Sequence, residues 1–333
     1  MNAVTLKDLA KELNLSINTV SRALRNMPDI SEETKKIVRE TAERMNYQTN
    51  MAASMLRTNR SKAIGVIVSD INNPVFSGMI KGVTFACKEA GYSILLSNTN
   101  EDYEEELSAV KSMLQRNVDG ILLFPSMVGD GSVQELIAKK IPFVMVGRYF
   151  SSINTNIVMN DDVHGGYLAA EHLFQKGHRN FIYITGSLKM SSSSERLTGF
   201  RQYLTEHGLS EKAVEVHETE ATWKGGYKAM LNILKIGTSA TAVFAFSDFM
   251  AMGILKALRK HNIHVPSQMA VIGYDDIDFC ELTVPALTTI DMSKFRLGKR
   301  AAELLIRDIN TPAKDRIIQR IIMEPKLIVR EST

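Results

Sequence analysis

Beyond residue 62 the chain alternates short apolar runs, rich in β-branched residues, with segments long enough to form helices. The apolar runs lie at 63–69, 92–97, 120–124 and 142–146, and a second set lies at 181–185, 242–246 and 270–273. Near-continuous apolar strands divided by helices are typical of parallel sheets that helices cover on both faces. Two such sets, with later segments that return to the first, predict two doubly wound parallel-sheet lobes.

The chain of 333 residues exceeds one core of ordinary size, so about two domains are expected. We assign residues 62–333 to the two-lobed α/β domain. Its first lobe should comprise about 62–160 and 291–323, and its second lobe about 161–290 and 324–333. A small all-α domain is expected at 1–46, followed by a linker at 47–61.

No apolar run reaches the roughly 18 residues that a membrane span needs, and the amino terminus has no signal-peptide pattern. We therefore expect a cytoplasmic protein with no membrane partner. The two cysteines, Cys87 and Cys280, lack metal-like spacing and sit in apolar surroundings. They are expected to be reduced core residues, and no metal is expected.

Three short amphipathic helices are predicted in the first 46 residues. Thr5 and Asp8 form a capping box, and apolar residues then follow at helical spacing. Asn14 permits a tight turn, and Ser16 can cap a second helix. A tight turn between the first two helices predicts a helix-turn-helix. The outward face of its second helix is expected to carry Ile17, Asn18, Ser21 and Arg22.

Such a second helix fits the major groove of DNA. There an arginine such as Arg22 can pair with guanine O6 and N7, and an asparagine such as Asn18 with adenine N6 and N7. Phosphates would be held by the hydroxyl groups of Thr5, Ser16, Thr19 and Thr34. The helical pattern alone is equally compatible with a three-helix bundle whose polar face is merely solvated.

The excess of positive charge lies entirely in the first sixty residues. They contain ten Lys and Arg against seven Asp and Glu, and this excess equals the net charge of +3 of the whole chain. A small basic segment next to a neutral remainder of the chain indicates that the segment binds a polyanion and that the remainder binds a different kind of partner.

The residues of this segment resemble the headpiece of the lactose-repressor (LacI/GalR-type) family. The resemblance is carried by Val4 to Ala10, Ser16 to Leu24, Val38 to Tyr47 and Asn50 to Arg57. It implies a sequence-specific transcriptional repressor that binds double-stranded operator DNA, with Tyr47 and Asn50 among its DNA contacts. It also implies a hinge helix in which Leu56 wedges between base steps of the minor groove and Ala53 packs beside it.

Polar residues follow the predicted strands of the two lobes, at 70–74, 125–126, 147–148, 186–187, 247–248 and 273–276. Ligands of open parallel sheets bind beyond the carboxyl ends of the strands, so two facing lobes would bring these residues to one cleft. Neither a GxGxxG nor a GxxxxGK motif is present, which argues against a dinucleotide or nucleoside triphosphate. No cofactor is expected.

The same stretches resemble the effector domain of the family, which is similar to periplasmic sugar-binding proteins. The supporting motifs lie at 72–76, 118–122, 195–200, 247–248, 273–276 and 285–290. By this resemblance Arg196 and Asp275 bind the polar groups of a small sugar-like effector, because an arginine donates hydrogen bonds and a carboxylate accepts them. A loop-capping role is the alternative for Asp275. The wall of the site is expected to include Phe76, Ser126, Arg148, Ser192 and Ser247.

Trp223 is the only tryptophan, and two interpretations of it stay open. The family places a stacking aromatic residue six positions before the tyrosine of a Gly-Tyr pair, where this chain has Ala221. Trp223 either replaces that aromatic residue in the effector site after a shift of the loop, or packs against the following helix.

An enzyme is one alternative, because carboxylate clusters can act as acid and base. The clusters are Asp161, Asp162 and His164, and Asp275, Asp276 and Asp278. No nucleophile with an adjacent base is evident, so we expect no enzyme. A sugar-binding carrier is a second alternative, but it would need export. A regulator that answers to a phosphoprotein, or to a non-sugar co-repressor such as a purine, remains open.

Specific and non-specific DNA binding differ by roughly 4–10 kcal/mol in free energy, and one headpiece makes too few base contacts to supply this difference. A two-fold homodimer doubles these contacts, so the operator is expected to be pseudo-palindromic. By resemblance, helices at 75–90 and 134–140 and part of the second lobe form the dimer interface. Effector binding is expected to change the angle between the lobes and thereby the folding of the hinge on DNA.

Overall fold

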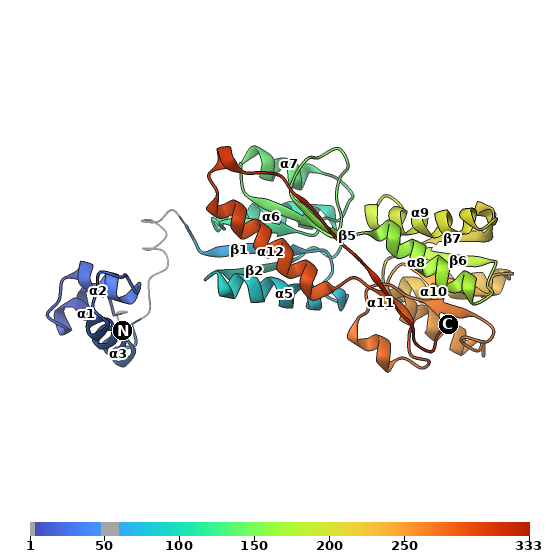
Figure 1. The fold of residues 1–333 in the computed structure, drawn as a ribbon, viewed down its shortest axis with the longest axis horizontal. Helices are drawn as coiled ribbons and strands as arrows, with labels where there is room; N and C mark the ends of the chain where they lie inside the picture. Colours follow the sequence, from blue (N-terminus) through green and yellow to red (C-terminus); the bar gives the residue numbers. More distant parts are fainter. Residues whose placement is uncertain (1–3, 48–59) are drawn as a thin grey trace. The chain divides into compact units, whose positions relative to one another are not determined.

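The computed structural model describes residues 4–47 and 60–333. The chain forms two compact units, Met1–Ser61 and Lys62–Thr333, whose elements are drawn in Figure 1. The first is all-α and the second is α/β. In the described part of the chain, no helix is both long and apolar enough to cross a membrane.

The first unit contains the three predicted helices, α1 (Leu6–Glu12), α2 (Ile17–Leu24) and α3 (Glu32–Arg44). Local side-chain chemistry sets where each begins. Thr5 and Asp8 form the reciprocal capping box of α1, and Ser16 accepts a hydrogen bond from the backbone N–H of Thr19 at the start of α2. Asn14 adopts a left-handed backbone, with φ of 51°, in the turn between α1 and α2. The core of this unit is formed by Leu9, Ala10, Val20, Ala23, Val38 and Ala42.

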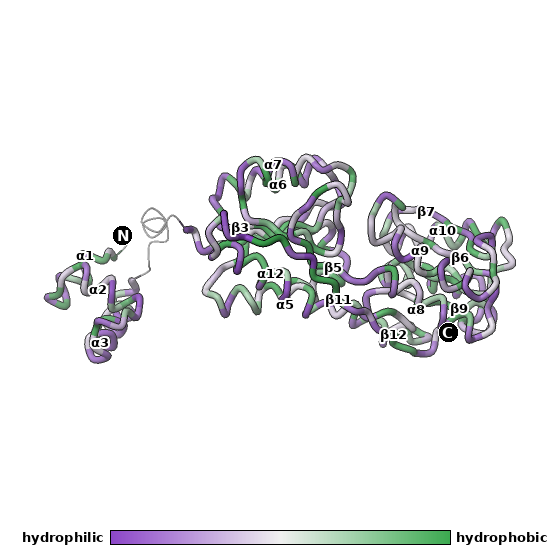
Figure 2. Tube along the Cα trace, turned by 45° about the horizontal axis from the view of Figure 1, so that its top comes forward, coloured by the Kyte–Doolittle hydropathy of each residue, from purple (hydrophilic) through white to green (hydrophobic). Residues whose placement is uncertain are grey.

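The first lobe of the second unit is built on a six-stranded parallel sheet with the order β11-β5-β4-β3-β1-β2. Its strands are β1 (Ala63–Val68), β2 (Ser93–Asn98), β3 (Gly120–Leu123), β4 (Phe143–Val146), β5 (Ile157–Asn160) and β11 (Arg320–Met323). Helices α5 (Val75–Glu89) and α12 (Lys294–Asn310) cover one face, and α6 (Tyr103–Gln115) and α7 (Gly131–Ala138) cover the other (Figure 2).

The second lobe has a four-stranded parallel sheet with the order β7-β6-β8-β9. Its strands are β6 (Phe181–Thr185), β7 (Val214–Glu218), β8 (Ala242–Ala245) and β9 (Ala270–Ile272). Its helices pack in two pairs, α8 (Asp162–Gln175) with α9 (Ser191–Glu206), and α10 (Trp223–Ile236) with α11 (Asp248–Lys260). Short 3₁₀ helices occur at Glu211–Ala213, Asp278–Leu282 and Ala313–Asp315.

The chain passes between the lobes three times. It leaves the first sheet at β5 and enters α8, and it returns from β10 (Thr289–Asp291) into α12. It then leaves β11 for β12 (Lys326–Ile328), which pairs antiparallel with β10. Each lobe is therefore assembled from segments far apart in the sequence, and the predicted fold class of two doubly wound lobes is confirmed.

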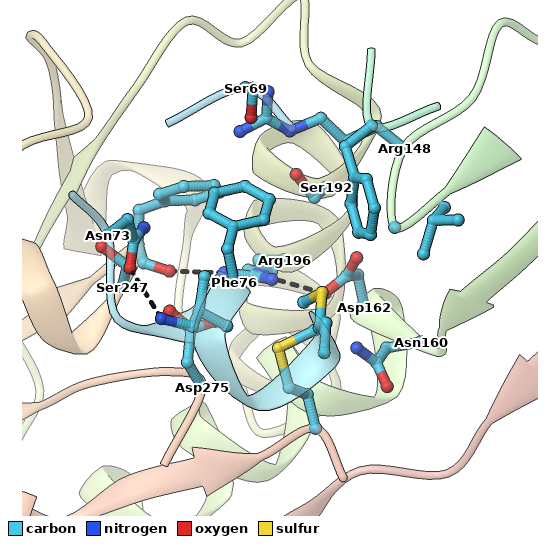
Figure 3. Close-up of a pocket in the computed structure, with 17 residues that line it drawn as sticks. Ser69, Asn73, Phe76, Arg148, Asn160, Asp162, Ser192, Arg196, Ser247 and Asp275 are labelled. Carbon is cyan, nitrogen blue, oxygen red and sulfur yellow. Dashed lines mark hydrogen bonds and ion pairs between the residues drawn. The ribbon is translucent and has the colours of Figure 1, made fainter. Parts of the chain in front are cut away.

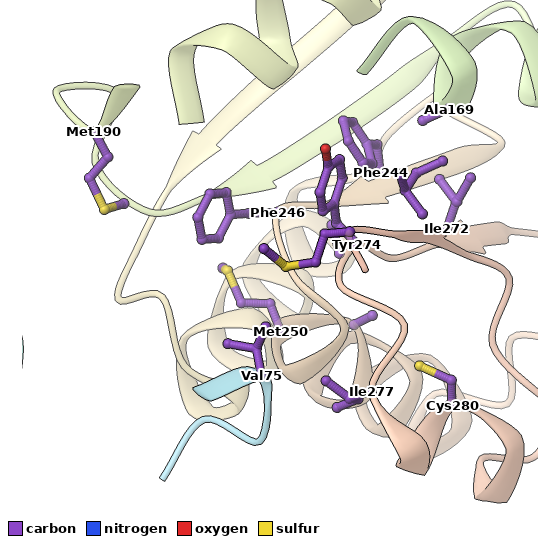
Figure 4. Close-up of a cluster of buried hydrophobic side chains, with 14 of the residues drawn as sticks. Val75, Ala169, Met190, Phe244, Phe246, Met250, Ile272, Tyr274, Ile277 and Cys280 are labelled. Carbon is purple, nitrogen blue, oxygen red and sulfur yellow. The ribbon is translucent and has the colours of Figure 1, made fainter. Parts of the chain in front are cut away.

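One apolar cluster extends across both lobes. Its second-lobe part includes the rings of Phe244, Phe246 and Tyr274, and Val75 of α5 lies beside Met250 of α11 (Figure 4). Cys87 and Cys280 are buried in the same cluster as free thiols. Some residues of this cluster, among them Val75, Phe76 and Phe246, also line the cavity described below.

Candidate functional site

The second helix of the first unit presents a polar face. Ile17 is 49% exposed and Asn18 is exposed, while Val20 and Ala23 are turned into the core. The hydroxyl groups predicted to hold phosphates also serve the local structure. Thr5 caps α1, Ser16 caps α2 and lies 2.8 Å from the Thr19 hydroxyl, and the Thr34 hydroxyl lies 2.8 Å from that of Ser31.

Ser21 differs from its predicted outward position. Only 9% of this residue is exposed, because its small side chain lies next to the inward stripe formed by Val20 and Ala23. Tyr47 is half-buried and packs against the core of the first unit, and this burial raises the pKa of its phenol. Asn50, Ala53 and Leu56 lie outside the described residues, so their expected roles in the hinge stay predictions.

Arg22 is held by Asp29, which follows α2. Arg22 Nε donates to Asp29 Oδ2 at 2.8 Å, and a second guanidinium nitrogen lies 2.5 Å from Oδ1. This bidentate pair lowers the pKa of Asp29 through its hydrogen bond to Arg22. A guanidinium has five N–H donors, so Asp29 can orient Arg22 through two of them while others remain for guanine O6 and N7.

In the second unit a cavity of about 60 Å³ lies between the two lobes. It is lined by Ser69, Asn73, Val75, Phe76, Met79, Phe124, Val146, Gly147, Arg148, Asn160, Asp162, Ser192, Arg196, Phe246, Ser247, Asp275 and Met292. Six of the eight residues predicted for the effector site line it, namely Phe76, Arg148, Ser192, Arg196, Ser247 and Asp275. Figure 3 shows the polar side chains on several sides of the Phe76 ring.

Arg196 is fixed on α9 by contacts on several sides. Its Nε donates to Asp162 Oδ1 at 2.8 Å, and another guanidinium nitrogen donates to the carbonyl of Phe246. Its guanidinium carbon lies 3.4 Å from the centre of the Tyr274 ring. Burial opposes its charge, but Asp162, Tyr274 and Asp275 raise its pKa above the ordinary arginine value. The site therefore contains a permanently charged, rigid donor.

Asp275 lies directly after β9 in an unusual backbone conformation. Its φ is 113° and that of Asp276 is 52°, values that side chains with a Cβ rarely adopt. Burial raises the pKa of Asp275 well above the ordinary aspartate value, while Arg196 and Lys294 act in the opposite direction. Nearby, Asp248 accepts from Thr289 Oγ1 at 2.6 Å and from the backbone N–H of Ile277 at 3.0 Å. Asp248 thus fixes the loop that carries Asp275.

Several buried polar atoms at the cavity have no hydrogen-bond partner among the described residues. They are the side-chain oxygens of Ser69, Asn160 and Ser192. An unsatisfied buried polar group costs about 1–3 kcal/mol. Three such atoms beside Arg196 and Asp275 form a site suited to a ligand that carries several hydroxyl groups, because each hydroxyl both donates and accepts.

A second cavity, of about 360 Å³, is lined by residues of both lobes. Its lining includes Ser126 together with Glu101, Met127, Met190 and Ala221. Glu101 also holds Arg148 of the first cavity through two hydrogen bonds of 2.8 and 2.9 Å. The structure therefore places Ser126 in a neighbouring cavity, which the Glu101–Arg148 pair separates from the one that contains Arg196.

Trp223 lines neither of these two cavities. It is the first residue of α10, and the ammonium group of Lys256 on α11 lies 4.8 Å from the centre of its ring. Of the two interpretations of Trp223, the structure shows packing against the following helix. Ala221, which precedes it, lines the second cavity.

The acidic cluster around residue 162 has structural partners. Asp161 caps α8 by accepting from the backbone N–H of His164 at 2.9 Å, and Asp162 pairs with Arg196. In residues 4–47 and 60–333, no three His, Cys, Asp or Glu side chains gather in a way that could hold a metal ion. Asn73 lies in the stretch 70–74 that was expected at the cleft, but Ser69, Asn160 and Asp162 were not assigned to it. Ser69 is the last residue of a predicted strand, whereas no strand was predicted where β5 ends at Asn160.

The two lobes also touch through Tyr149, which follows β4. Its hydroxyl donates to Glu195 on α9 at 2.5 Å, and its backbone N–H donates to Ser191 Oγ at 3.2 Å. The hydrogen bond to Glu195, together with burial, raises the pKa of Tyr149 to about 12. These contacts hold the segment after β4 against the helix that carries Arg196.

A helix-turn-helix and a two-lobed domain with a polar cleft, joined in one chain, define a ligand-responsive DNA-binding regulator. Residues 5–50 match the family described as bacterial regulatory proteins, lacI family, and residues 170–333 match the periplasmic binding protein-like domain. The chain belongs to the LacI family. It is a DNA-binding transcriptional regulator and not an enzyme.

Similar proteins extend over nearly the whole chain. The HTH-type transcriptional repressor PurR of Actinobacillus pleuropneumoniae serotype 3 (strain JL03) is 32% identical over 328 residues, which is 98% of each chain. The ribose operon repressor of Haemophilus influenzae is 31% identical over 330 residues, again 98% of each chain. The solved structure of a LacI family transcriptional regulator from Enterococcus faecalis V583 with bound ribose is 34% identical, with a TM-score of 0.73, and the match covers 81% of this chain and 98% of that one.

Proposed function

We propose that this protein represses transcription by binding a pseudo-palindromic operator as a homodimer, and that a small sugar bound between its lobes controls this binding. A cytoplasmic location, where operator DNA would be found, is part of the same proposal. Domain limits of 1–46 for the headpiece, 47–61 for the hinge and 62–333 for the effector domain belong to the same proposal. The observation that carries the sugar assignment is the group of unpartnered buried oxygens at the cavity.

A sugar suits this group for a chemical reason. The oxygens of Ser69, Asn160 and Ser192 come from three separate elements and surround one cavity with Arg196 and Asp275. A monosaccharide presents a hydroxyl on almost every carbon, so it can satisfy several of them at once. The Enterococcus faecalis relative, whose structure contains ribose, supports a pentose as the first candidate.

A purine-like co-repressor is the second candidate, and the aromatic wall of the cavity favours it. Phe76 and Phe124 pack edge to face with ring centres 5.5 Å apart, and Phe246 lines the same cavity. Flat heteroaromatic rings stack well on such walls, and the unpartnered oxygens could equally bind ring nitrogens. The two candidates differ in their hydroxyl groups: a monosaccharide carries several, and a purine base carries few or none.

Calorimetric titration of the full-length protein separates these candidates. Ribose, other monosaccharides and hypoxanthine would be titrated separately, and duplexes selected from a random pool would then be tested with and without each compound that binds. We expect saturable binding of one sugar and a changed operator affinity in its presence. If no duplex is preferred over random competitor at moderate salt, the repressor assignment fails; if only hypoxanthine binds, the sugar assignment fails.

Replacement of Arg22 with alanine is expected to relax base preference at one guanine in each half-site by about tenfold or more. The reason is the loss of a bidentate donor that Asp29 orients. Fluorescence anisotropy with single-base variants of the selected operator measures this preference. The matched control is Arg39→Ala on α3, where Arg39 bonds Asn26; it should weaken all duplexes equally or not at all. An unchanged preference in the Arg22 variant would refute the role.

An exposed apolar groove on α5 supports the proposed homodimer. It is lined by Ile71, Ser77, Ile80, Lys81, Thr84, Phe85, Lys88 and Phe295, and its volume is about 590 Å³. Ile71 is 51% exposed and Phe85 43% exposed, and they gather with Ile80 and Phe295 in one groove, as expected of an interaction surface. A second copy related by a two-fold axis would cover the groove in both subunits.

Ile80→Glu should therefore convert the dimer to a monomer and reduce operator affinity, because a buried unpaired carboxylate is costly at an interface. Analytical ultracentrifugation measures the mass, and anisotropy measures operator binding. Ile236→Glu is the control, since Ile236 is 84% exposed at the end of α10, outside the groove. A dimer that persists in the Ile80 variant would place the interface elsewhere.

A further inference from the structure

Lys294 belongs to the first lobe but contacts the effector-site loop of the second. It is the first residue of α12, directly after the chain returns from β10. Its ammonium group donates to the backbone carbonyl of Asp275 at 2.9 Å and also to that of Asp276. A single side chain thus holds two consecutive carbonyls across the boundary between the lobes.

The turn that Lys294 holds is strained. Asp275 and Asp276 both have positive φ, 113° and 52°, and neither is glycine. Such conformations persist only where surrounding contacts enforce them. The backbone N–H of Asp275 donates to the carbonyl of Ile290 at 2.8 Å, and Arg330 holds the Asp276 carboxylate at 2.8 Å. Among these contacts, Lys294 is the one that comes from a helix of the first lobe.

The stem of Lys294 is also fixed at its first-lobe end. Gly78 of α5 faces it so closely that a Cβ at position 78 would lie 2.9 Å from Lys294 Cβ. Helices α5 and α12 pack tightly along one face of the first sheet. A movement of the 275–276 turn would therefore be transmitted through Lys294 to this helix pair.

We propose that Lys294 is a positioning residue that holds the strained turn carrying Asp275 and couples the effector cavity to helices α5 and α12 of the first lobe. This rests on the proposed function in one respect, namely that Asp275 contacts the effector. The chemistry is that of an ammonium group with three donors, two of which bind carbonyls of the turn. An effector that shifts Asp275 would change the geometry of these two hydrogen bonds.

Hydrogen–deuterium exchange of the full-length protein tests this without any ligand. Lys294→Met keeps an apolar stem of similar length and removes the donors, so exchange at the amides of 275–280 should rise by about tenfold or more. Lys294→Arg should restore protection. Lys299→Met on the same helix is the control, because the Lys299 ammonium lies 3.7 Å from Glu303 of its own helix. Unchanged exchange at 275–280 in the folded Lys294→Met protein would overturn the proposal.

Two further measurements keep the test decisive. If Lys294→Met does not fold, Lys294→Gln, which keeps one amide donor group, is measured in the same way and should exchange faster than wild type. With ribose as the probe, Lys294→Met should reduce the effect of the sugar on operator affinity. If wild type binds neither ribose nor another monosaccharide, the sugar assignment fails on its own, while the exchange result still decides the role of Lys294.

Discussion

Asp275→Ala should abolish the influence of the effector and leave operator affinity unchanged. The carboxyl group is buried beside Arg196 at the cavity, and its removal takes away a hydrogen-bonding partner for ligand hydroxyl groups. Loss of this partner leaves a buried ligand hydroxyl unsatisfied, which costs about 1–3 kcal/mol, so we expect effector affinity to fall by about 10- to 100-fold. Calorimetry measures the affinity, and anisotropy with the selected operator measures DNA binding.

Asp278→Ala is the matched control for this variant. Asp278 lies three residues further along the same loop, but it is exposed and does not line the cavity. Its replacement should leave both effector and operator binding as in wild type. A folded Asp275→Ala protein that responds normally to the effector would exclude Asp275 from the site. One that no longer binds operator would show that Asp275 acts on the DNA-bound state itself.

Arg196→Ala is expected to destabilise the protein strongly as well as to abolish effector binding. The Arg196 side chain is 5% exposed and that of its partner Asp162 is 2% exposed. Removal of the arginine leaves Asp162 as a buried carboxylate whose pKa burial already raises. Breaking a buried pair in this way costs about 3–5 kcal/mol. Chemical denaturation followed by circular dichroism measures the loss in the free energy of unfolding.

A double variant distinguishes the loss of the pair from the loss of the arginine alone. Arg196→Met combined with Asp162→Asn removes both charges and keeps side chains of similar volume. It should be more stable than Arg196→Met alone, because no uncompensated charge stays buried. If the double variant is less stable than the single one, Asp162 stabilises the lobe independently of Arg196. Effector binding should be lost in both proteins, since both lack the guanidinium group.

The two-lobed fold could be predicted from the sequence because its signals are local. Apolar runs such as 63–69 and 181–185 are almost wholly buried strands, and the caps Thr5 and Ser16 begin their helices as expected. The prediction that Ser21 faces outward was wrong. Helical spacing does not show how closely a small side chain lies to the buried stripe of its helix. The sequence does not decide where the Trp223 side chain lies, because its neighbour Lys256 belongs to another helix.

The partners inside the cleft could not be predicted, because they join residues far apart in the sequence. Asp162 in the sequence suggested a carboxylate cluster with Asp161, whereas in the structure it pairs with Arg196, 34 residues away. Ser69 ends a predicted strand and Asn160 lies where no strand was predicted, so neither indicated a cavity that depends on the two lobes facing each other. The link from Lys294 to the turn at 275–276 likewise depends on the return of the chain to the first lobe.

The threefold passage of the chain between the lobes has a consequence for genetic truncation. A stop codon placed after residue 319 would delete β11, an edge strand of the first sheet, and β12, the partner of β10, in a single event. Neither lobe can therefore be cut out as one contiguous fragment, and a nonsense mutation at any codon from 320 to 323 should damage both halves of the effector domain together.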